Sequence, residues 1–129
     1  MIRSEHKNTC LTYAVARYFN QDPKKTPFFI GKRWWTIALE NYFKERGLKI
    51  SIVKYKKSLL ANKKKLYFVQ GLSPKSKVKS NAPRNKRLRG INHVGLYRGT
   101  VPYYDDPYGT KKFIKGVPLF VYIVEKLPC

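Results

Sequence analysis

Acidic side chains are scarce in this chain. Seven Asp and Glu residues stand against 28 Lys and Arg residues among 129, which gives a formal net charge of +21 at pH 7. Such an excess predicts attraction to polyanions such as nucleic acid or to an acidic protein partner. A lysine-rich composition that serves solubility is the simpler interpretation, because the basic residues are spread along the chain. Since acids are so few, the adjacent pair Asp105 and Asp106 is a candidate for a specific role.

Long apolar runs, cysteine and histidine are scarce as well. No stretch of 18 or more apolar residues occurs, so no transmembrane segment is expected. Residues 1–7 contain no apolar signal core, and an intracellular (cytoplasmic) product is therefore expected. Cys10 and Cys129 are the only cysteines, and a disulfide between them is not expected in a reducing compartment. The only histidines are His6 and His93.

What is present favours one α+β domain over residues 1–129. Hydrophobic residues make up 43% of the chain, which is enough for a core. They recur with helical spacing from Cys10 to Phe19 and again over 33–46. Strands are predicted at 48–53, 66–69 and 118–124. We therefore expect N-terminal helices that pack on an antiparallel β-sheet, with residues 1–8 extended.

The segment 72–90 has the composition of a mobile basic loop. It contains Pro74, Pro83 and Gly90 and is too polar to pack. Its basic side chains are the candidate polyanion-binding residues: Lys75, Lys77, Lys79, Arg84, Lys86, Arg87 and Arg89.

Residues 91–107 predict a β-hairpin, because strand-favouring residues flank the sequence Arg98-Gly99-Thr100. A two-residue turn at Gly99-Thr100 would use the positive φ that glycine adopts easily. Arg98 would then oppose Val101, and the strands would continue in that register.

The same register brings His93 opposite Asp106. A three-residue turn would bring Asp105 opposite His93 instead, because a slip of one residue moves every side chain to the other face. A histidine held by a carboxylate is the orienting half of a nucleophilic triad.

Cys10 is the candidate nucleophile. Asn8 and Thr9 predict a helix cap, which would place Cys10 in the first turn, where the helix dipole lowers the pKa of a thiol. The simpler interpretations are a small core cysteine and a structural strand histidine. A metal site formed by Cys10, His93 and Asp106 would lack the paired spacing typical of such ligands, so no metal and no other cofactor is expected.

Four stretches resemble a known family. They are NTCLTYAVA at 8–16, WW to ERGL at 34–48, VQGLSP at 69–74, and NHV to DP at 92–107. In this order they resemble the papain-like cysteine peptidases, and more closely the small bacterial and phage domains related to double-glycine leader peptidases. The Asp-Pro turn of that pattern favours Asp106 over Asp105.

The resemblance implies a papain-like fold and hydrolysis of an amide bond in a peptide or protein substrate. Cys10 would be the nucleophile, His93 the general base and then the acid, and Asp106 the residue that orients His93. The family usually has a Gln before the Cys that stabilises the oxyanion, but residues 3–8 contain none. Ser4 and Asn8 are the candidates to replace it.

A second function is compatible with the same residues. The chain would then be a weakly active or inactive papain-like domain that binds nucleic acid through its basic surface, or a structural protein of a phage or virus particle. In the peptidase interpretation, too, the protein could be phage or virus encoded and particle associated.

Overall fold

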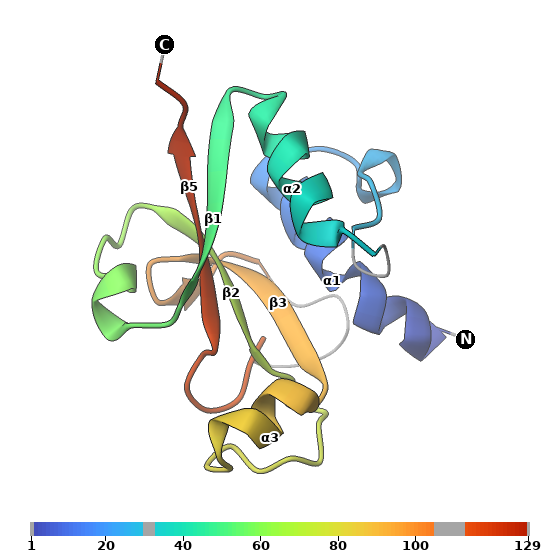
Figure 1. The fold of residues 1–129 in the computed structure, drawn as a ribbon, viewed down its shortest axis with the longest axis vertical. Coiled ribbons are helices and arrows are strands. Elements are labelled where there is room, and N and C mark those ends of the chain that lie inside the picture. The colour runs from blue at the N-terminus through green and yellow to red at the C-terminus, as the bar shows by residue number, and fades with distance from the viewer. Residues whose placement is uncertain (1, 30–32, 105–112, 129) are drawn as a thin grey trace.

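A computed structural model describes residues 2–29, 33–104 and 113–128 (Figure 1). In chain order the elements are α1 (Ile2–Tyr18), η1 (Pro23–Lys25), α2 (Trp35–Lys44), β1 (Leu48–Lys54), η2 (Lys57–Leu60), β2 (Leu66–Leu72), α3 (Arg84–Arg89), β3 (Asn92–Arg98), β4 (Val101–Pro102) and β5 (Phe120–Lys126). Helices precede an antiparallel sheet, which confirms the predicted α+β class.

Within the described residues the sheet has five strands in the order β1-β5-β2-β3-β4. The C-terminal strand β5 pairs with β1 on one side and with β2 on the other. Figure 1 shows α1 and α2 on one side of this sheet. Helix α1 packs against β3, and α2 packs against β1.

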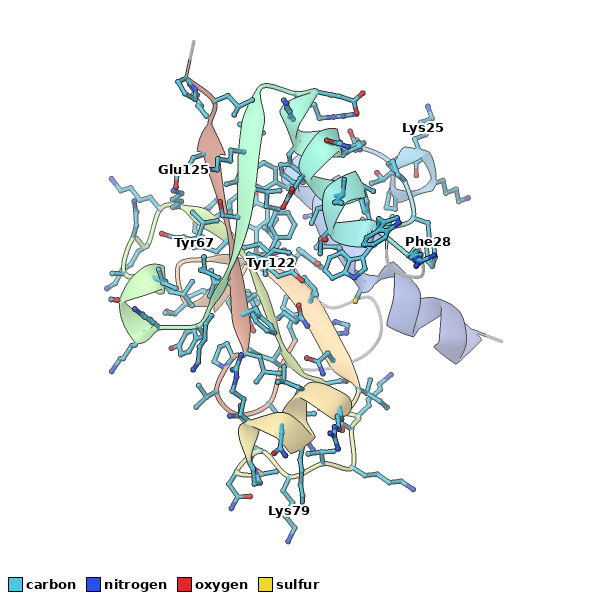
Figure 2. All side chains as sticks on the ribbon, viewed as in Figure 1. Lys25, Phe28, Tyr67, Lys79, Tyr122 and Glu125 are labelled. Atoms are coloured by element: carbon cyan, nitrogen blue, oxygen red, sulfur yellow. The ribbon has the colours of Figure 1, made fainter. Side chains whose placement is uncertain are left out.

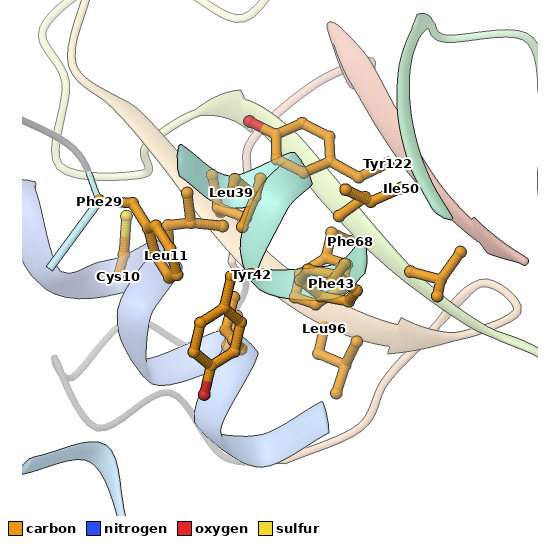
Figure 3. Close-up of a cluster of buried hydrophobic side chains, with 14 residues drawn as sticks. Cys10, Leu11, Phe29, Leu39, Tyr42, Phe43, Ile50, Phe68, Leu96 and Tyr122 are labelled. Carbon is orange, nitrogen blue, oxygen red and sulfur yellow. The ribbon is translucent and has the colours of Figure 1, made fainter. Parts of the chain in front are cut away.

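Alternation along the strands divides the buried side chains between the two faces of the sheet. The helix-facing cluster joins α1 and α2 to the sheet (Figure 3), and its members are Cys10, Leu11, Ala14, Val15, Phe29, Leu39, Tyr42, Phe43, Ile50, Phe68, Val94, Leu96, Tyr122 and Val124. The far-face cluster contains Leu60, Tyr67, Val69, Tyr97, Phe113, Ile114 and Val121. The sheet is therefore covered on both faces, although only one face carries long helices.

Helix α1 begins much earlier than the sequence pattern indicated. The prediction of an extended segment at residues 1–8 and a helix that starts at Asn8-Thr9 is wrong, because α1 already begins at Ile2. Residues 2–18 contain neither Gly nor Pro, so nothing in them stops a helix. Like the other helices within the described ranges, α1 lacks the combination of length and apolar character needed to cross a membrane.

The segment 72–90 is more regular than predicted. The expectation of a loop throughout is wrong for Arg84–Arg89, which form α3. Backbone bonds such as Ser73 N–H to Ile91 O and Lys115 N–H to Leu72 O tie the segment to the rest of the fold. A polar segment can be ordered in this way because hydrogen bonds replace the apolar contacts that its sequence lacks.

Candidate active site

The hairpin turn forms as predicted. Arg98 pairs with Val101 across a two-residue turn, and Gly99 has a φ of 60°. Asp105 and Asp106 lie outside the described residues. The second strand is shorter than predicted, because β4 comprises only Val101–Pro102 and residues 103–104 are bends. The opposition of His93 and Asp106 stays a prediction.

Cys10 lies in the middle of α1 and not in its first turn, so that part of the sequence prediction is wrong. The effect of the helix dipole is confined to the terminal turn and does not extend to Cys10. The side chain is only 1% exposed and belongs to the helix-facing cluster, together with Phe29, Leu39 and Val94. Figure 3 draws Cys10 together with the apolar side chains of this cluster. Apolar surroundings of this kind disfavour a thiolate.

His93 lies on β3, the strand against which α1 packs. Its ring is 7% exposed and stacks on Phe113, with 5.8 Å between the ring centroids and 16° between the planes. Phe113 also covers Gly95, two residues along the same strand. Since residues i and i+2 of a strand share a face, His93 and Gly95 belong to the side of β3 opposite to Val94, which packs in the cluster of Cys10.

Tyr104 connects the two sides of β3. Its ring packs against both buried clusters. The centroid of the ring is 4.9 Å from that of Phe113, in the far-face cluster, and 5.3 Å from that of Tyr13, on α1. Tyr13 lies one helical turn after Cys10 on α1, so the two side chains share a helix face. A continuous run of aromatic rings therefore leads from the Cys10 face of α1, by way of Tyr104 and Phe113, to His93.

A partly buried polar network that the sequence analysis did not identify crosses the helix-facing side of the sheet. The Tyr122 hydroxyl donates to Gln70 Oε1 at 2.5 Å, and Gln70 Nε2 donates to Asn92 Oδ1 at 3.3 Å. Asn92 Nδ2 then donates to the carbonyl oxygens of Arg87 at 3.1 Å and Gly90 at 3.0 Å. The signal was Gln70 itself, a polar residue inside the apolar strand sequence LYFVQGL.

Tyr122 brings this network into the electrostatic range of Cys10. The hydroxyl is fully buried, and burial raises the pKa of Tyr122 well above its ordinary value. The electrostatic interaction with Cys10 raises that pKa further. The phenol therefore stays protonated and acts as a hydrogen-bond donor within the core.

The remaining predicted site residues divide into two groups. For Ser4 and Asn8 only the helical backbone of α1 is described, so their role as oxyanion donors stays a prediction. The basic set does gather around α3 and the loop before it, where Lys79, Lys86 and Arg89 line one pocket.

No protein-family model, curated protein or solved structure matches the chain. The functional proposal therefore depends on the residues of the chain itself.

Proposed function

We propose that the chain is a papain-like cysteine hydrolase of amide bonds, in which Cys10 is the nucleophile, His93 the general base and Asp106 the residue that orients His93. One observation supports the proposal: α1, which holds Cys10, packs on β3, which holds His93. Because His93 alternates to the other side of β3, its imidazole would have to reach the thiol past the start of that strand. His93 takes the thiol proton, the sulfur attacks the peptide carbonyl, and the leaving amine receives the proton. Water then hydrolyses the thioester and restores the thiol.

Burial determines how this chemistry would have to proceed. Cys10 is mid-helix and nearly unexposed, so its activation would depend on His93 and not on the helix terminus. His93 would take the thiol proton as the sulfur attacks the carbonyl. Because the thiol is buried in the helix-facing cluster, the substrate would have to displace some of the side chains that cover the sulfur. Such movements open and close many enzyme active sites.

Hydrolysis of a fluorogenic peptide library tests the proposal, with matched substitutions of both histidines. Cys10→Ala should abolish turnover. His93→Gln should lower it at least about 100-fold, the usual contribution of a general base. His6→Gln is the control and should leave it unchanged. Turnover by Cys10→Ala equal to that of the wild-type chain would refute the assignment.

Alkylation gives a readout that needs no substrate. In a Cys129→Ser background, iodoacetamide should modify Cys10 of the folded chain, and the rate should fall in His93→Gln but not in His6→Gln. Modification only after addition of a denaturant would show that Cys10 is an inert core residue. That result would favour the second candidate function.

The second candidate function is that of a non-catalytic papain-like domain, which binds nucleic acid or forms a structural part of a phage or virus particle. It is favoured by the 1% exposure of Cys10 inside an apolar cluster, since a free cysteine commonly behaves as a small hydrophobic residue. Cys10→Ala would then change neither binding nor any biological readout.

A further inference from the structure

An open pocket of about 650 Å³ lies between α3 and the loop that precedes it. Figure 1 shows α3 at the end of the sheet remote from the C-terminus. The residues that line the pocket are Val78, Lys79, Asn81, Ala82, Pro83, Lys86, Arg89 and Gly90.

Some basic side chains of this region contact the protein itself, and others line the pocket. Arg87 donates from Nε to Ala82 O at 3.0 Å and from a terminal nitrogen to Val117 O at 3.2 Å, so it holds the loop in place. The Arg84 guanidinium lies 5.2 Å from the ring centre of Phe120. These two arginines are structural, although in sequence they cannot be distinguished from their neighbours.

Lys79, Lys86 and Arg89 are exposed and converge on the pocket instead. Lys79 comes from the loop, and the other two come from α3, three residues apart and therefore on one face of the helix. Three cations around one hollow attract an anion with more than one negative charge.

The acids whose side chains the structure describes lie elsewhere. Asp22 precedes η1, Glu40 belongs to α2, Glu45 caps the end of α2, and Glu125 belongs to β5. Figure 2 labels Glu125 and Lys79 toward opposite ends of the molecule. None of these four acids lines the pocket, so none neutralises its charge locally.

The pocket also has an apolar side, formed by Val78, Ala82 and Pro83. Nearby, Leu88 and Ile91 are 42% and 36% exposed. A ligand that combines repeated anionic groups with flat apolar faces would use both features. Nucleotides have this combination, and only in a single strand is the base available to enter a pocket, because a duplex stacks its bases inside.

We propose that this pocket binds single-stranded nucleic acid, with the phosphates on Lys79, Lys86 and Arg89 and a base against the apolar side. A planar lipid surface could meet the same charges but could not fill the hollow. The site does not depend on Cys10 or His93, so it goes beyond the proposed hydrolase activity.

Fluorescence anisotropy with a labelled oligothymidylate tests the proposal at several salt concentrations. The substituted protein is Lys79→Gln, Lys86→Gln, Arg89→Gln. The control removes the same charge from exposed lysines around η2 and the loop after it: Lys56→Gln, Lys57→Gln, Lys64→Gln. The pocket variant should bind at least about tenfold more weakly, and its salt slope should fall by about 2, since each phosphate contact on a single strand contributes about 0.7. The control variant should lose far less affinity for the oligomer than the pocket variant.

Three outcomes would overturn the proposal: no binding by the wild-type chain at low salt, equal losses in the two triple variants, or equal affinity for an abasic oligomer of the same charge. Tighter binding to phosphatidylserine vesicles than to the oligomer would assign the surface to membranes instead. Circular dichroism should show that both triple variants are folded. The single variant Lys79→Glu, outside α3, repeats the test if the triple variant does not fold.

Discussion

The ring of Phe113 lies directly over Gly95, so close that a Cβ on that glycine would be 2.4 Å from ring carbon Cγ. The same ring stacks on His93. The absence of a side chain at position 95 is thus what allows Phe113 to pack against the histidine strand. This contact ties the far-face cluster to His93, one of the three candidate catalytic residues.

Gly95→Ala should therefore destabilise the fold by about 1–3 kcal/mol, the usual cost of overpacking a core. Gly71→Ala is the matched comparison, because its added Cβ would meet Ile114 side-chain atoms at 3.2 Å and needs a smaller adjustment. Urea titration of both variants measures the difference. The interpretation fails if Gly71→Ala is the more destabilised of the two.

Removal of the Tyr122 hydroxyl should be costly even though it deletes a single atom. In Tyr122→Phe, the partly buried Gln70 Oε1 loses the donor that it has in the folded protein, which costs about 1 kcal/mol. Tyr103→Phe is the control, since Tyr103 is partly exposed at the hairpin, and its change should stay within about 0.5 kcal/mol. Equal effects would mean that the Tyr122 to Gln70 bond contributes nothing specific.

The stability difference between wild type and Tyr122→Phe should also depend on pH. Burial raises the pKa of Tyr122, so the folded chain keeps this proton at a pH where the unfolded chain loses it. The unfolded state then binds fewer protons, and stability falls as pH rises above about 10, the ordinary pKa of tyrosine. Unfolding titrations from about pH 8 to about pH 11 should show the wild-type advantage shrinking with rising pH. A constant advantage would contradict the burial of a protonated phenol.

Asn92 fastens the end of α3 to the sheet. Asn92→Ala removes the Nδ2 donor to the carbonyl oxygens of Arg87 and Gly90, at the C-terminal end of α3. We expect a loss of about 1–2 kcal/mol and faster amide exchange in α3 than in the strands. Asn41→Ala on the exposed side of α2 is the control. Unchanged exchange in α3 would show that Asn92 does not anchor it.

Local sequence patterns correctly predicted several elements. The spacing of Trp35, Leu39 and Tyr42 indicated α2, and Gly47 follows it with a φ of 75°. The hairpin turn at Gly99 and strand β3 before it were also predicted, whereas the strand after the turn, β4, is much shorter than predicted. These features depend on side chains a few residues apart, and periodicity and turn chemistry describe such short-range relations well.

The start of α1 shows where local signals were insufficient. Asn8 and Thr9 are good capping residues, yet the helix continues through them to Ile2. A cap signal is a preference of about 1 kcal/mol, and a long helix without Gly or Pro can override it. The environment of Cys10 changed accordingly, from a helix terminus to a helix interior.

By itself the sequence determined the α+β class, the hairpin register near Gly99 and the large excess of positive charge. Only the tertiary structure decided that β5 enters the sheet between β1 and β2, that Cys10 is buried mid-helix, and that His93 stacks on Phe113. It also decided which basic residues line a pocket and which hold a loop. The physical reason is that these relations join residues far apart in the chain, whose proximity depends on how the whole core packs and not on any local preference.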